Sequence, residues 1–226
     1  MSTQRRIRLE KFSPLQQGLA VAVALAFAAL IASTFYLFFA LSGNWLTPAP
    51  RNVAERNIMA AQTRVREARA DGGEAYLIAQ LELVYAQLEA GHIDDALAGA
   101  EALAAEYPDA PQVLVTYAHM LYEVGRFDEA SAQLNTARAL LGSEPTEVLR
   151  AVYALQGRIA FDRGSFQEAY ALFLNAAEIK PASAYYYVLA GDAAYREGRR
   201  EAAEEAYRLA RTYDPDIELT HPELIR

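Results

Sequence analysis

Residues that can do acid–base, metal or nucleophilic chemistry are few in this sequence and lie far apart. The three histidines, His92, His119 and His221, form no cluster with metal-ligand spacing, and the chain has no cysteine. His119 and Glu123 lie one helical turn apart, but this spacing more often gives a simple pair on a helix face than a catalytic pair. No nucleophile–base pair and no glycine-rich phosphate loop is found. The sequence therefore predicts a protein that is not an enzyme and has no cofactor or metal site.

Charge is unevenly distributed along the 226 residues, whose formal net charge is −8. Four basic residues stand against one acid in residues 1–14, namely Arg5, Arg6, Arg8 and Lys11 against Glu10. This segment therefore carries +3, and the remainder carries −11. An acidic body repels phosphate backbones, so nucleic acid is not expected as a partner.

A stretch without any charged residue separates Lys11 from Arg51. Within it, residues 18–41 are almost wholly apolar, and 24 residues are enough to cross a hydrocarbon core of about 30 Å. Aromatic residues crowd its far end, where rings sit well among lipid headgroups. We predict a basic cytoplasmic tail over 1–14 and a single-pass transmembrane anchor over 15–46. Because basic residues stay inside, the remainder should lie outside the cytoplasm, in the periplasm of a bacterial-type inner membrane.

Two other interpretations of the apolar segment remain open. A buried core helix rarely runs this long without a charge. A cleavable signal peptide is the stronger alternative, because small residues at Ala40 and Ser42 offer a cleavage site. The apolar core of a signal peptide is usually about 7–15 residues, however, and this one is longer. The length favours a retained signal anchor.

Residues 47–73 are predicted to form a spacer and a leading helix. Pro48 and Pro50 stiffen the spacer, and Asn52 with Glu55 is typical of a capping-box helix start. A helix is therefore expected over 53–70. Its narrow apolar seam is formed by Ala54, Ile58, Ala61, Val65 and Ala68. We expect this seam to pack on the next helices rather than on another copy of itself.

A short signature with glycine first, acidic residues inside and alanine last occurs four times. The glycines are Gly91, Gly125, Gly164 and Gly198, which are 34, 39 and 34 residues apart, and the alanines are Ala96, Ala130, Ala169 and Ala203. A 34-residue period is typical of stacked helix pairs. The predicted first helices span 74–90, 112–124, 147–163 and 184–197. The predicted second helices span 94–106, 128–141, 167–180 and 201–213, and Pro108, Pro181 and Pro215 end three of them.

These motifs resemble the tetratricopeptide repeat family over residues 74–215. The resemblance implies an all-α fold in which the transmembrane helix precedes a right-handed α-solenoid of four helix pairs, at about 77–110, 111–144, 150–183 and 184–217. Small residues at Ala118, Gly157 and Gly191 match the family's packing site in the first helix, whereas Val84 is bulkier and predicts a looser first hairpin. Ile93, Phe127 and Phe166 would plug the hairpin ends, and Arg200 departs from that pattern. An insertion after Gly142 explains the longer second repeat.

The resemblance also implies a concave groove that is lined by the first helices and binds peptides. The implied partner-binding residues are Tyr85, Leu88, Glu89, His119, Tyr122, Glu123, Arg158, Phe161, Asp162, Asp192, Tyr195 and Arg196. The rings offer apolar anchors, and the acids Glu89, Glu123 and Asp162 would attract a basic segment. The alternative is that the rings pack within the superhelix and that the acids form a solvated face. One ring of residues 185–187 should face the groove, and another should pack on the preceding repeat.

The C-terminal tail, residues 216–226, is too short for a normal capping helix. Either the last helix has a polar outer face or a partner covers it; Glu201, Glu204, Glu205 and Arg208 favour the first.

The predicted function is that of a membrane-anchored scaffold or accessory subunit whose partners are proteins or peptides, such as a membrane complex. The alternative is a chaperone-like holder of unfolded clients in protein translocation or cytochrome c maturation. An enzyme is a poor third hypothesis.

Overall fold

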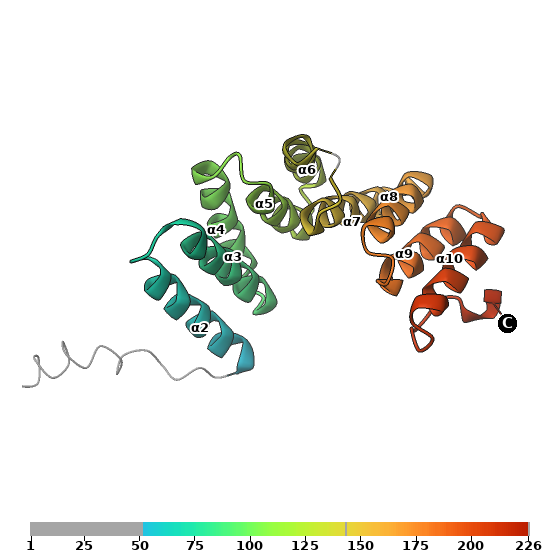
Figure 1. Ribbon diagram of the computed structural model, residues 1–226, viewed down its shortest axis with the longest axis horizontal. Helices are drawn as coiled ribbons and strands as arrows, with labels where there is room; N and C mark the ends of the chain where they lie inside the picture. The colour runs from blue at the N-terminus through green and yellow to red at the C-terminus, as the bar shows by residue number, and fades with distance from the viewer. Residues whose placement is uncertain (1–51, 143, 226) are drawn as a thin grey trace, which may run out of the picture. The chain divides into compact units, whose positions relative to one another are not determined.

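The computed structural model describes residues 52–142 and 144–225, and this part is helical without any strand. Its helices, shown in Figure 1, are α2 (Val53–Ala68), α3 (Gly73–Glu89), α4 (Ile93–Glu106), α5 (Pro111–Glu123), α6 (Phe127–Leu141), α7 (Glu147–Asp162), α8 (Phe166–Ile179), α9 (Ala184–Arg196), α10 (Arg200–Tyr213) and the short 3-10 helix η1 (Pro222–Ile225). No helix within the described ranges is long and apolar enough to cross a membrane. The predicted anchor, residues 15–46, lies outside those ranges.

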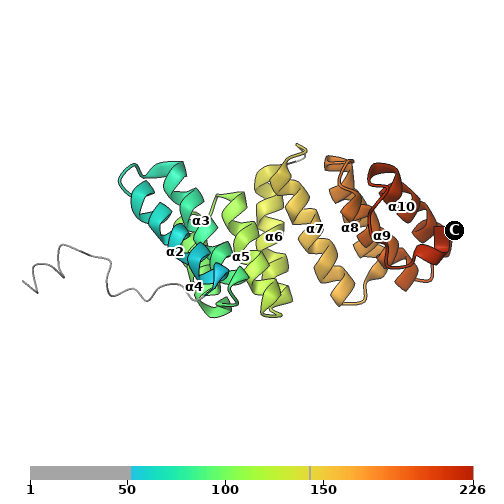
Figure 2. The same cartoon turned by 90° about the horizontal axis from the view of Figure 1, so that it is seen from below.

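The helices of this body stand side by side in chain order, each packed on the next (Figure 2). The four signature glycines make the turns between paired helices, as predicted. At Gly125, φ is 75°, a left-handed conformation that costs glycine little, and the amide of Arg126 donates to the carbonyl of Leu121 at 2.8 Å. The other three turns repeat this bond at the same place. Each turn thereby reverses the chain and sets up an antiparallel hairpin.

The helix limits differ from the predicted ones by one residue at most within the four pairs. The larger difference is at α2, which ends at Ala68 rather than at residue 70. Arg69 is the C-cap, the amides of Asp71 and Gly72 both donate to the carbonyl of Ala68, and Gly72 and Gly73 then take positive φ angles of 63° and 62°. At the other end Asn52 caps the helix, and its side chain accepts a hydrogen bond from the amide of Glu55 at 2.8 Å.

The seam of α2 packs on α3, as expected. Ile58 and Ala61 are buried and form one cluster with Ala86, to which Leu83 and Ala90 add. The leading helix is therefore part of the array and extends it by one helix before the first signature. The packing of α2 on another copy is not needed to bury this seam.

The third and fourth hairpins each have a glycine in the first helix that receives a large ring from the second. A Cβ on Gly157 would come within 2.7 Å of the Phe173 ring, and a Cβ on Gly191 within 2.5 Å of the Tyr207 ring. In the first hairpin the sizes are exchanged: Val84 lies in α3, and a Cβ on Gly99 of α4 would lie 3.2 Å from its Cγ2. Val84 remains 2% exposed, so the bulky residue is accommodated by a glycine opposite it. The prediction of a looser hairpin rested on Val84 alone and did not pair it with Gly99.

The C-terminal segment itself covers part of the last hairpin, whereas the alternatives predicted from the sequence were only a polar outer face or a covering partner. The segment after α10 folds back on the last hairpin and buries Leu219 and Leu224 against Tyr207 and Ala210. The segment forms no normal capping helix, as expected, but its irregular chain and the four-residue η1 still cover an apolar helix face with two leucines. The end of the array is closed by the chain itself.

Candidate functional site

The first helices of the four pairs share a hollow of about 250 Å³. Its walls carry Tyr85 from α3, His119 from α5, Arg158 from α7, and Tyr185, Tyr186 and Leu189 from α9. All ten lining residues come from α3, α5, α7 and α9, and none from a second helix. The array therefore gathers residues up to about a hundred positions apart on one surface, formed by the helices to which the resemblance assigned the groove.

Three of the twelve predicted groove residues line this hollow: Tyr85, His119 and Arg158. The Tyr85 and His119 rings lie with their centroids 6.0 Å apart, and the Tyr85 hydroxyl is 3.4 Å from Oγ1 of the buried Thr116. These contacts fix one wall of the hollow across two repeats.

The other lining residues were not among the predicted ones. Ala151 and Ala154 lie on α7, seven and four residues before Arg158, so they occupy the same helix face two turns and one turn earlier, respectively. Their small size leaves the space between the walls open. Extending the predicted face by i−4 and i−7 would have found them. Tyr185 and Tyr186 also line the hollow. Tyr187 is buried, and its ring stacks on that of Tyr213 with the centroids 5.4 Å apart.

A second group of predicted residues lies at the C-terminal ends of the first helices and joins one repeat to the next. The Tyr122 hydroxyl donates to Asp162 Oδ2 at 2.7 Å. Burial, and then this hydrogen bond, raises the pKa of Tyr122 to about 12, so the phenol stays protonated and remains a donor. Arg196 lies over the rings of Phe161 and Phe166, 5.6 and 5.0 Å from their centroids. These side chains make contacts between repeats, in line with the packing alternative.

Two predicted groove residues of the fourth repeat, Asp192 and Tyr195, contact the C-terminal segment. Asp192 accepts hydrogen bonds from Tyr207 at 2.6 Å and from Thr220 at 3.1 Å. The Tyr195 ring stacks on His221 with centroids 3.7 Å apart. Neither side chain lines the hollow, since the chain's own tail lies against both.

The remaining predicted residues are at the edges of the site. Leu88 is half-buried and packs on the main core cluster, and Glu89 is exposed at the end of α3. Glu123 Oε1 lies 3.3 Å from His119 Nε2. Burial, to which the nearby Arg158 guanidinium adds, lowers the pKa of His119 although Glu123 opposes the shift. His119 is therefore neutral near pH 7.

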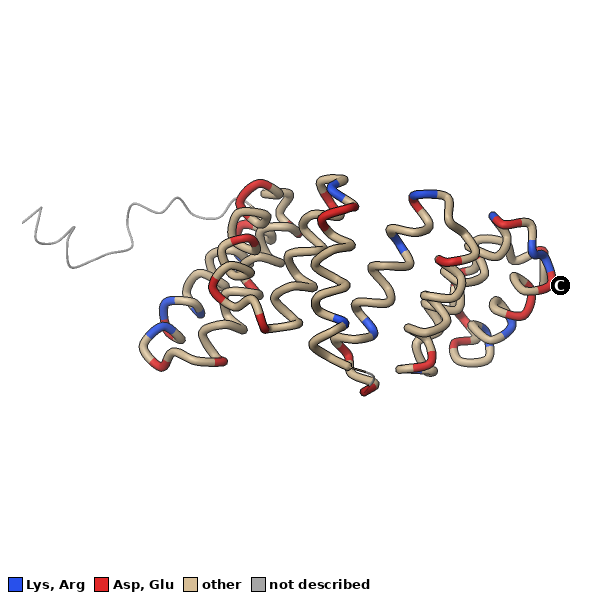
Figure 3. The backbone as a smooth tube through the Cα atoms, turned by 90° about the horizontal axis from the view of Figure 1, so that it is seen from above, with Lys and Arg blue, Asp and Glu red and all other residues tan. Residues whose placement is uncertain are grey.

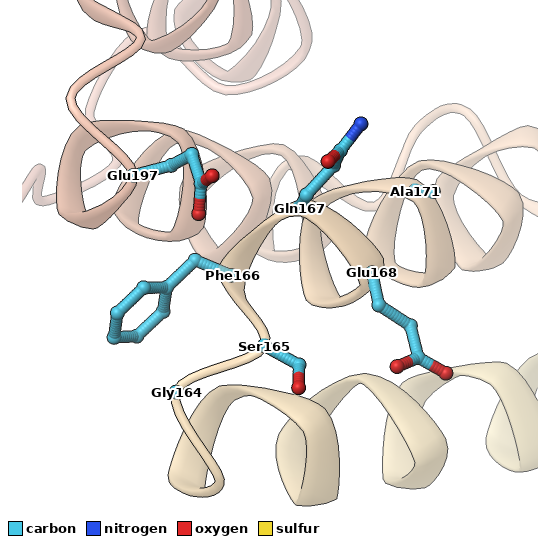
Figure 4. Close-up of a pocket in the computed structure, with 7 residues that line it drawn as sticks. All are labelled: Gly164, Ser165, Phe166, Gln167, Glu168, Ala171 and Glu197. Atoms are coloured by element: carbon cyan, nitrogen blue, oxygen red, sulfur yellow. The ribbon is translucent and has the colours of Figure 1, made fainter.

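A larger surface hollow, of about 570 Å³, lies at the turn between α7 and α8 beside Glu197. Figure 4 shows that its side chains spread apart: Phe166 and Glu168 point to opposite sides. No group of polar atoms converges on a point there, so it lacks the arrangement of a ligand site.

Charged groups of both signs are dispersed over the body, as Figure 3 shows. Among the residues with described positions, no three potential metal ligands lie together. The hollow between the first helices combines aromatic, apolar and charged side chains.

The comparisons with known proteins agree with this architecture. Models described as tetratricopeptide repeat match residues 87–152 and 184–217. No curated protein matches the chain. Among solved structures, BtubC from P. vanneervenii is 16% identical with a TM-score of 0.63, and the match covers 74% of this chain and 76% of that one. MamA from MSR-1 is 18% identical with a TM-score of 0.52, over 71% of this chain and 97% of that one. At these identities the similarity shows the fold alone.

Proposed function

The chain is a tetratricopeptide repeat protein, and we propose that it is a membrane-anchored scaffold that binds protein partners through the hollow between its first helices. Proteins of this family are generally non-enzymatic scaffolds. The proposed partner is a protein segment, and the proposed role is to hold that partner at the outer face of a bacterial-type inner membrane.

One observation carries the binding proposal: the four first helices place ten residues around one hollow. Most of these residues are aromatic or small and apolar, and one of them, Arg158, has a permanent charge. Concave sites with mostly apolar walls and a few polar groups are where proteins commonly bind their ligands. Aromatic anchors in such sites account for much of the free energy of binding.

The membrane part of the proposal is supported by the sequence of residues 15–46. Its apolar core has the length of a bilayer span, and four basic residues precede it. The acidic repeat body would then lie in the periplasm, with the N-terminus in the cytoplasm.

We expect Ala154→Glu, which places a bulky carboxylate at the floor of the hollow, to abolish cross-linking to the partner in native membranes. The matched control is Ala102→Glu on α4, an exposed position on a second helix with the same charge change. Cross-linking mass spectrometry on both variants, with circular dichroism to check folding, measures the effect. Equal partner capture by the two folded variants would show that the hollow is not the binding surface. One stoichiometric partner supports the scaffold, whereas many weak ones favour the client-holder alternative.

The membrane proposal predicts that an alkaline phosphatase fused after residue 226 is active and that carbonate washing leaves the chain in the membrane. The physical reason is that the basic cluster holds the N-terminus inside while the apolar segment spans the bilayer. Activity of a cytoplasmic reporter fused at the same position, or release of the chain by carbonate, would contradict the membrane proposal. Either result would leave the groove proposal standing.

A further inference from the structure

The acids of the predicted groove are already engaged within the chain. Asp162 accepts from Tyr122 at 2.7 Å, and Asp192 accepts from Tyr207 and Thr220. Glu123 lies 3.3 Å from the His119 ring. None of these carboxylates lines the hollow, and neither does Glu89. The expectation that acids attract a basic partner therefore has little support at the place where a partner would bind.

Arg158 is in the opposite situation. It lies on the wall of the hollow, half-buried, and within the described part of the chain no hydrogen bond or ion pair engages its guanidinium. Among the ten lining residues it is the one with a permanent charge. A half-buried guanidinium without a partner keeps its five donors available, and their planar geometry matches a carboxylate.

The net charge of the chain does not override this local cation. At physiological ionic strength, charges separated by more than about 8 Å of solvent are largely screened. The nearest acids are Glu123, 3.3 Å from the lining His119, and Asp162, which accepts a hydrogen bond from Tyr122. Neither lines the hollow, so a carboxylate bound there would meet Arg158 at hydrogen-bond range before it met either acid.

The size of the hollow also limits its occupant. Its volume of about 250 Å³ is below the roughly 300–1,000 Å³ of small-molecule sites, and it suits a single bulky side chain. The rings of Tyr85, Tyr185 and Tyr186 form its walls, and Ala151 and Ala154 leave room at its floor. Rings around a small floor favour an aromatic or large aliphatic side chain.

We infer that the hollow binds a peptide segment in which a large apolar side chain is flanked by an acidic residue, with the apolar side chain between the tyrosines and the carboxylate on Arg158. This inference rests on the proposed function and specifies the chemistry of the partner.

The test uses the full chain in detergent micelles and three fluorescent peptides that differ at two kinds of position. The first peptide is Gly-Ser-Glu-Phe-Glu-Ser-Gly; the second has Lys in place of both Glu residues, and the third has Ala in place of Phe. Fluorescence anisotropy should show the first peptide binding at least tenfold more tightly than either of the others. Arg158→Glu should weaken binding of the first peptide at least tenfold and make the Lys peptide the better ligand.

The matched control is Arg138→Glu on α6, which changes the net charge equally at an exposed position outside the hollow. Arg158→Gln, which removes the charge with a smaller electrostatic change, is measured in parallel so that misfolding of one variant does not decide the result. Tighter binding of the Lys peptide to the wild-type chain, blocked by Ala154→Glu, would overturn the inference while supporting the groove. Equal losses in Arg158→Glu and Arg138→Glu, or no binding of any peptide at millimolar concentration, would overturn it as well.

Discussion

Gly157→Ala should lower the free energy of unfolding by about 1–3 kcal/mol through overpacking. The new Cβ would lie 2.7 Å from Cε1 and 2.8 Å from Cδ1 of Phe173, whose side chain is 1% exposed and has no room to move away. In an ordinary helix interior the same change stabilises by about 0.5–1 kcal/mol, because alanine loses less conformational freedom than glycine. A net loss therefore reports the contact with Phe173, and chemical denaturation of the full chain in detergent measures it.

The matched control for this change is Gly99→Ala, another helix-interior glycine, where the new Cβ would lie at the milder distance of 3.2 Å from Val84. A second control combines Gly157→Ala with Phe173→Leu. These positions would then carry the alanine and leucine that Ala118 and Leu134 provide in the second repeat, where both are fully buried. The double variant should be more stable than the sum of its single changes predicts. If Gly157→Ala is as stable as Gly99→Ala, the assigned packing of α7 on α8 is wrong.

Replacing both Leu219 and Leu224 with Ala should unfold the last hairpin locally. The two side chains are 7% and 9% exposed. Replacing a buried leucine with alanine lowers the free energy of unfolding by about 2–5 kcal/mol. In a repeat array each unit is stabilised by its neighbours, so the loss should be largest where the tail packs. Hydrogen exchange should accelerate in α9 and α10 and change little in α3–α6.

Glu218→Ala serves as the control for the tail, because Glu218 lies directly before Leu219 and is exposed. It should leave the exchange rates of α9 and α10 unchanged. The interpretation of the tail as a cap would fail if the double leucine variant gave exchange rates equal to those of the control. The tail also contacts Asp192 through Thr220 and Tyr195 through His221.

The sequence by itself determined the helix pairs and their turns. Gly125 and its three counterparts had to take the left-handed conformation that ends a helix, and this requirement is local, so a single residue type at a regular spacing reveals it. The buried alanines, such as Ala130 and Ala169, were visible for a similar reason: two helices that cross closely need a small residue at the crossing. The helix face that lines the hollow followed from the family resemblance, which assigned Tyr85, His119 and Arg158 to the groove, and all three line the hollow.

Only the tertiary structure decided which of these side chains are available to a partner. Tyr122 and Asp162 are forty residues apart, and nothing in their local sequence shows that the hydroxyl of one engages the carboxylate of the other. The exchange of sizes between Val84 and Gly99, and the return of Leu219 onto Tyr207, likewise depend on which helices meet. Charge is the clearest case: the sequence contains more acids than bases, but Asp162 and Asp192 accept hydrogen bonds within the fold, whereas Arg158 lines the hollow. Short-range conformational preferences can be read from residue types, whereas the partner of each polar group is set by contacts between distant segments.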